Sequence, residues 1–144
     1  MNLLSELKSL LEDETDMIAN AANMSAFLYE NISDLNWVGF YFLKRNELVL
    51  GPFQGKIACT RIKLGKGVCG TAFLEKKLLN VPDVHSFVGH IACDSASRSE
   101  LVIPLYKGDE GIGVLDVDSP LLDRFDAHLE GFFREASLLF LDRI

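Results

Sequence analysis

The sequence predicts an α+β fold in which an N-terminal and a C-terminal helix pack on one side of a central antiparallel sheet. Two observations predict it: apolar residues recur at helical spacing near both ends of the chain, and the middle of the chain alternates with a period of two. Helices first, strands next and a helix last are typical of one sheet with helices on one face. The length of 144 residues, without a repeat or linker, fits one domain over residues 1–144.

The first half of the chain supplies one helix and three strands. Met17, Ala21, Met24 and Leu28 recur at helical spacing and predict an amphipathic helix. From Asn36 the period changes to two, and the strand-like runs are separated by turn residues at 45–46, 51 and 55. We therefore expect an antiparallel meander over residues 37–43, 48–53 and 57–64.

The second half begins with a glycine-rich turn at residues 65–70, which we expect to feed a short helix over 71–76 and a strand over 78–81. Residues 82–99 are polar and cannot form a core element, and a loop of that length is usually functional or disordered. Two strands, 100–106 and 111–118, form a predicted hairpin around Gly108-Asp109. A broad apolar face predicts the closing helix over 126–143.

Charge and composition exclude several classes of function. The chain has 14 basic and 21 acidic side chains and a net charge of -7, which disfavours nucleic acid as a partner. No apolar run approaches the roughly 20 residues that span a bilayer, and residues 1–12 interleave Leu with Glu and Lys, unlike a signal peptide. The 3 cysteines are too few for a disulfide scaffold. We therefore expect a cytoplasmic protein without a membrane partner, whose cysteines are buried or reactive.

Carboxylates gather on one face of the last predicted strand. Asp116 and Asp118 share that face because side chains alternate along a strand. If Glu100 of the preceding strand joins them, crowding of like charges would raise the pKa of at least one carboxyl, which could then act as a general acid. The alternative is that these residues are solvated at a strand end.

Two aromatic side chains share a face of the first strand. Trp37, Gly39 and Tyr41 alternate, so that the glycine leaves a gap between two rings and a wall for a small apolar group. The alternative is that both rings pack in the core, which is the more common outcome for strand aromatics.

The three cysteines differ in their surroundings. Cys59 shares a predicted strand face with Arg61 and Lys63, near the surface. Cys69 lies between glycines at a helix start, where backbone N–H groups and the helix dipole would stabilise a thiolate. Cys93 lies in the polar loop beside Asp94. By these arguments Cys69 and Cys93 are both candidate nucleophiles, and the alternative for each is a buried, inert thiol.

The histidines give little indication of a metal site. His90 and Cys93 have the spacing of half a site, with His85 nearby, but no second pair of ligands accompanies them. His128 lies on the closing helix as an ordinary surface residue. We predict no bound metal.

The chain as a whole resembles the free methionine-(R)-sulfoxide reductases, which are built on a GAF domain. The resemblance covers nearly the whole chain and rests on six motifs: NWVGFY at 36–41, IAC at 57–59, GKGVCG at 65–70, HIACD at 90–94, SELVIP at 99–104 and GVLDVDSP at 113–120. It implies that Cys93 is the attacking thiol, that Cys59 resolves it and that Cys69 is auxiliary. It also implies that Glu100, Asp116 and Asp118 surround the polar groups of the substrate, and that Trp37 and Tyr41 bound the pocket for its methyl end.

The resemblance implies a thiol mechanism without a cofactor. Cys93 attacks the sulfoxide sulfur, Asp118 with Glu100 as its partner donates a proton to the oxygen, and Cys59 condenses with the resulting sulfenic acid. Thioredoxin would reduce the disulfide. Backbone N–H groups of the loop would hold an oxyanion or the substrate carboxylate, at Asp94, Ser95, Ala96 and Ser97.

The resemblance and the apolar early helix also favour a homodimer. The alternative function is a GAF module that binds a ligand or senses redox state without catalysis, since one fold supports both.

Overall fold

The computed structural model describes residues 2–90 and 95–144. Its centre is a six-stranded antiparallel sheet with the strand order β3-β2-β1-β6-β5-β4. The strands are β1 (Trp37–Lys44), β2 (Glu47–Gly55), β3 (Arg61–Lys63), β4 (Leu79–Val81), β5 (Ser99–Lys107) and β6 (Glu110–Ser119). The meander β1-β2-β3 and the β5-β6 hairpin are thereby confirmed, and β6 pairs with β1 to join them.

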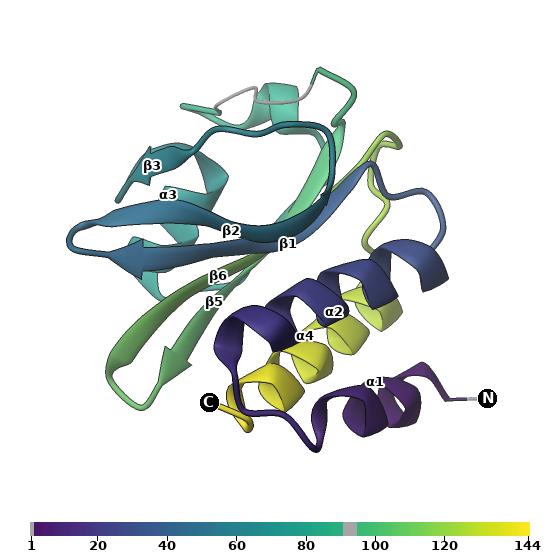
Figure 1. Ribbon diagram of the computed structural model, residues 1–144. Coiled ribbons are helices and arrows are strands. Elements are labelled where there is room, and N and C mark those ends of the chain that lie inside the picture. The colour runs from purple at the N-terminus through teal and green to yellow at the C-terminus, as the bar shows by residue number, and fades with distance from the viewer. Residues whose placement is uncertain (1, 91–94) are drawn as a thin grey trace.

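Three helices lie on one side of the sheet, as Figure 1 shows. Two of them, α2 (Met17–Asn31) and α4 (Ala127–Leu141), pack on the strands, and α1 (Leu3–Leu11) packs on these two helices. Each begins at an N-cap side chain that accepts a backbone N–H: Asn2 for α1, Asp16 for α2 and Asp126 for α4. The N-terminal and C-terminal helices therefore pack on one side, as predicted.

The face under these helices is mainly apolar. Phe40 and Phe42 of β1 stack against Phe140 of α4, with ring centroids 4.7 Å and 6.4 Å apart. Alternate residues of β5 and β6, such as Leu101 and Leu115, are fully buried in the same cluster. This cluster is the main core, because it includes the buried residues of all three helices.

The opposite face carries α3 (Gly67–Glu75). The predicted start of this helix at Thr71 is wrong by four residues, and Cys69 lies inside the helix. The low helix propensity of glycine favours a turn at 65–70, but packing overrides this propensity and the helix begins at Gly67. A Cβ on Gly70 would lie 2.4 Å from the carbonyl oxygen of Lys63, so the glycine allows α3 to approach β3 closely.

Two other predicted elements need correction. The strand predicted over 57–64 is only β3 (Arg61–Lys63), and Cys59 lies in the loop before it. The polar segment 82–99 contains a 3-10 turn, η1 (Val84–Ser86), whose Val84 is fully buried, so part of it does contribute to packing. Among the described residues no helix is long and apolar enough to cross a membrane.

Candidate functional site

A pocket lies between the sheet and α3, on the face opposite the main core. Its floor is formed by alternate residues of β1, β5 and β6, and its sides by α3 and by loop residues. The lining includes seven predicted site residues: Trp37, Tyr41, Cys69, Ser97, Glu100, Asp116 and Asp118. The predictions that Asp116 and Asp118 share one strand face, and that Trp37 and Tyr41 share another, are confirmed. The register joins the two sets, because Asp118 lies opposite both Trp37 and Glu100.

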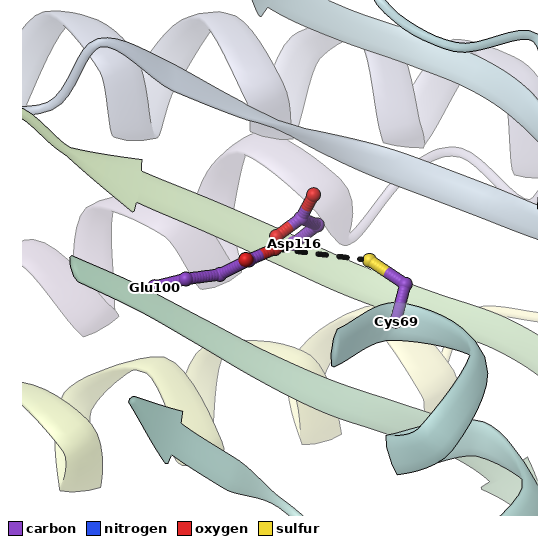
Figure 2. Close-up of side chains that lie close together, drawn as sticks. All are labelled: Cys69, Glu100 and Asp116. Atoms are coloured by element: carbon purple, nitrogen blue, oxygen red, sulfur yellow. Dashed lines mark hydrogen bonds between the residues drawn. The ribbon is translucent and has the colours of Figure 1, made fainter. Parts of the chain in front are cut away.

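Three of these groups meet at the centre of the pocket, and Figure 2 shows them. The Cys69 Sγ donates to Glu100 Oε2 over 3.9 Å, and Asp116 lies beside both. Cys69 is 4% exposed, and Glu100 and Asp116 are each 6% exposed. The alternative that these carboxylates are solvated is therefore wrong for Glu100 and Asp116, whereas Asp118 is half-buried.

Burial changes the protonation of this cluster. The pKa of Glu100 is well above its usual value, because burial disfavours the charged form and Asp116 and Asp118 lie close by. Burial also raises the pKa of Asp116. Removal of a charged carboxyl from water is costly, so the pocket favours the protonated form of Glu100 in particular. This is the general-acid environment that the sequence predicted.

Cys69 does not have the thiolate character that its place at a helix start predicted. Burial raises the pKa of its thiol well above the usual value, and the nearby Asp116 and Glu100 raise it further. The helix dipole is worth at most about 2 kcal/mol in favourable geometry, and here desolvation outweighs it. Cys69 is a free, protonated thiol, which weakens its candidacy as the nucleophile.

The aromatic wall differs from its prediction in one respect. Trp37 and Tyr41 line the pocket and stack with ring centroids 5.9 Å apart. The gap at Gly39 is not open, because Phe53 of β2 fills it and stacks on Trp37 at 5.1 Å. A Cβ on Gly39 would lie 2.3 Å from the Cβ of Phe53. The glycine therefore makes room for a third ring and not for a ligand.

The loop residues predicted to bind substrate are only partly described. Cys93 and Asp94 lie outside the described residues. Ser97 lines the pocket, is 6% exposed, and accepts a hydrogen bond from Asn36 Nδ2 at 3.0 Å. Ser95 and Ala96 are exposed. The structure therefore brings Ser97 to the site, and the other loop assignments stay predictions.

The family model for the GAF domain matches residues 6–140. This chain belongs to the GAF domain family. Relatives within the family include a protein named free methionine-R-sulfoxide reductase from Escherichia coli. It is 53% identical over 124 residues, which cover 86% of this chain and 75% of the relative.

Two solved structures of GAF proteins are also very similar. The reduced form of fRMsr of Staphylococcus aureus has a TM-score of 0.95 and 51% identity, covering 98% of this chain and 92% of that chain. The free methionine-R-sulfoxide reductase of Neisseria meningitidis, solved in complex with its substrate, has a TM-score of 0.94 and 45% identity, covering 98% of this chain and 85% of that chain.

Three possible metal-ligand atoms in the pocket lie close enough together for a metal site. One ligand atom each from Cys69, Glu100 and Asp116 lies within 4.8 Å of the others. Their raised pKa values mean that a cation would have to displace protons to bind. His90, singled out with Cys93 as half a metal site, instead lies 4.0 Å from Glu100 Oε1, and burial lowers its pKa.

Sequence reasoning missed several residues of the pocket. Lys66 and Val68, from the turn and the first turn of α3, line it. Ile57 and Ala58 line it from the loop before β3. For Lys66 and Val68 the available signal was the glycine-rich motif, but the start of α3 had to be placed correctly before these two side chains could be assigned to the pocket.

Proposed function

We propose that this protein reduces free methionine-(R)-sulfoxide to methionine. The observation that carries the proposal is the buried cluster of Cys69, Glu100 and Asp116 under an aromatic wall, in which burial raises the pKa of all three groups. Sulfoxide reduction needs a proton donor for the oxygen, and a buried carboxylic acid supplies one near neutral pH. Similarity to reductases that act on this substrate supports the same assignment.

The first step transfers the oxygen atom. The Cys93 thiolate attacks the sulfoxide sulfur while a carboxyl group protonates the oxygen, for which we favour Asp118 with Glu100 as its partner. The direct pairing of Glu100 with Asp118 across β5 and β6 supports this assignment. The products are methionine and a sulfenic acid on Cys93, so the sulfur of the substrate is reduced by two electrons and Cys93 is oxidised by two.

The second step regenerates the enzyme. The Cys59 thiol condenses with the sulfenic acid, one S–S bond forms, and one water leaves. Thioredoxin then supplies two thiols, which reduce the disulfide and become a disulfide themselves. Cys59 is disulfide-bonded in the structure, whereas Cys69 is a free thiol, which supports Cys59 as the resolving residue. We also propose that the enzyme works in the cytoplasm as a homodimer.

Substrate recognition divides between the ends of the amino acid. The rings of Trp37 and Tyr41 provide the apolar surface for the methyl end. Carboxylates of the pocket suit an ammonium group, and backbone N–H groups at 94–97 suit a carboxylate. A residue within a polypeptide lacks both charged ends, so we propose that the free amino acid is the substrate.

Methionine release from the R and S epimers of free methionine sulfoxide, with a dithiol as reductant, tests this function. We expect release from the R epimer. Cys93→Ser should abolish even the first turnover, whereas Cys59→Ser should release about one equivalent and then stop with thioredoxin as reductant. Asp118→Asn should slow the single-turnover rate sharply.

Three outcomes would contradict the proposal or one of its assignments. No release from either epimer would favour a ligand-binding or redox-sensing GAF module without catalysis. Steady turnover by Cys93→Ser would show that the nucleophile is assigned wrongly, and an unchanged single-turnover rate in Asp118→Asn would show the same for the acid.

A further inference from the structure

The loop that carries Cys59 is held by hydrogen bonds from the neighbouring strands. Residues 56–60 connect β2 to β3. Trp37 Nε1 donates to the carbonyl of Lys56 at 3.1 Å, and the Tyr41 hydroxyl donates to the carbonyl of Cys59 at 2.9 Å. The backbone N–H of Leu50 donates to the carbonyl of Thr60 at 3.0 Å. Three of the five loop carbonyls are therefore fixed from β1 and β2.

The loop has little apolar packing of its own to replace these bonds. Its Ile57 side chain is 90% exposed, and Lys56 and Thr60 are exposed as well. Cys59 is half-buried. Ala58 packs against the apolar cluster on the pocket side. The three hydrogen bonds to the loop backbone therefore constrain its conformation together with this contact and the Cys59 disulfide.

The donors themselves are buried. Trp37 is 3% exposed and Tyr41 is 2% exposed, so each needs an acceptor for its polar end. Burial and the nearby Asp116 raise the pKa of Tyr41, so its hydroxyl stays a donor throughout the physiological range. The ring of each side chain thus lines the pocket, and its polar end donates a hydrogen bond to the loop.

We infer that Tyr41 is a positioning residue for Cys59, and that its hydroxyl keeps the Cys59 thiol oriented for disulfide formation. The bonded carbonyl belongs to Cys59 itself, so fixing it restricts the direction of the Cα–Cβ bond and leaves mainly χ1 free. A disulfide requires narrow ranges of Cα and Cβ separation, and a preordered backbone lowers the entropy cost of reaching them. The inference rests on the proposed function in taking Cys59 as the resolving cysteine.

Tyr41→Phe separates the two contacts of Tyr41, because it keeps the ring and removes only the hydroxyl. Tyr106→Phe is the matched control. The Tyr106 hydroxyl also donates to a backbone carbonyl, that of Phe73, at 2.8 Å, and its ring also stacks on a neighbour. This hydrogen bond joins Tyr106 to α3 and not to the Cys59 loop. Each variant therefore loses one hydrogen bond from a tyrosine hydroxyl to a backbone carbonyl.

The first test measures the equilibrium between the Cys59 disulfide and its thiol in dithiol/disulfide buffers, by alkylation and mass spectrometry. Each protein disulfide takes two electrons and two protons from one dithiol. We expect Tyr41→Phe to lower the equilibrium constant for the disulfide about two- to tenfold, the range for loss of one hydrogen bond. We expect Tyr106→Phe to change it less than about twofold. No change in Tyr41→Phe, or the same change in both variants, would overturn the inference.

The second test follows the resolving step directly. After one equivalent of methionine-(R)-sulfoxide, a sulfenic-acid trapping reagent should label more Tyr41→Phe protein than wild-type or Tyr106→Phe protein. Hydrogen exchange of the amides at 57–60 should also be faster in Tyr41→Phe alone. If the wild type releases no methionine, the proposed function fails, while the disulfide equilibrium and hydrogen exchange still decide whether Tyr41 positions Cys59. Unchanged exchange at 57–60 would contradict the positioning role.

Discussion

Glu100 makes the stability of the protein depend on pH in a direction opposite to that of most carboxylates. Its pKa is raised in the folded state by burial and by Asp116 and Asp118. In the window that begins just above the ordinary carboxyl value, near pH 4.3, the folded state therefore binds more protons than the unfolded state. Stability is fully present below that window and falls as the pH rises through it.

The slope follows from proton linkage. A difference of one bound proton changes the free energy of unfolding by about 1.4 kcal/mol per pH unit. Glu100→Gln has nearly the same shape, keeps an oxygen that can accept from the Cys69 thiol, and cannot ionise. In the window above pH 5 we therefore expect the stability of the variant to fall less steeply than that of the wild type, by up to about 1.4 kcal/mol per pH unit.

Urea denaturation at half-unit pH steps measures this slope, with the redox state held constant. Asp109→Asn is the control, because Asp109 lies exposed in the β5-β6 turn. The control should follow the wild-type curve. A Glu100→Gln curve parallel to that of the wild type would refute the argument that the folded state holds a proton on Glu100.

Two further predictions concern Gly39 and Cys69. In urea denaturation, Gly39→Ala should lower the free energy of unfolding by about 1–3 kcal/mol, because its Cβ would clash with Phe53. The control Gly131→Ala, in the open middle of α4, should raise it by about 0.5–1 kcal/mol. Equal effects of the two substitutions would contradict the packing argument. Labelling of Cys69 by iodoacetamide at pH 8, followed by mass spectrometry, should be slower by about tenfold or more in the folded protein than in urea, because burial raises the pKa of the thiol. Equal labelling rates would contradict the burial of Cys69.

Local sequence patterns were sufficient to predict the helices and strands whose apolar residues recur with a clear period. The stripe from Met17 to Leu28 gave α2, and the alternation around Asp116 placed two carboxyl groups on one face of β6. Whether Glu100 joins them stayed open in the sequence, and the register of the β5-β6 hairpin places it opposite Asp118. The pairing of Asp116 with Asp118 on one face was thus predictable because strand periodicity is short-range, whereas the contribution of Glu100 depends on the register between two strands.

The start of α3 and the loop around Cys59 depend on contacts between distant segments. Local propensity disfavours a helix at Gly67–Gly70, and only the close approach to Lys63 explains it. The run at 57–60 looks like a strand, but the Tyr41 hydroxyl donates to the carbonyl of Cys59, and Trp37 Nε1 donates to the carbonyl of Lys56 just before the run. Both carbonyls are thereby held away from a strand ladder. The filled gap at Gly39 likewise depends on Phe53, which sequence spacing does not place. These features could not be read from neighbouring residues.

The alternation of the two faces along each strand has a consequence for how this protein can vary. In β6, Leu115 and Val117 point into the helix-covered core, while Asp116 and Asp118 face the pocket. Deleting one residue upstream of Asp116 within β6 would exchange these sides, placing carboxylates under the helices and apolar groups in the pocket. Length changes next to Asp116 should therefore disrupt the site more than single substitutions do. Nearer its start, β6 already accommodates one extra residue at Ile112, where its pairing with β5 shifts register.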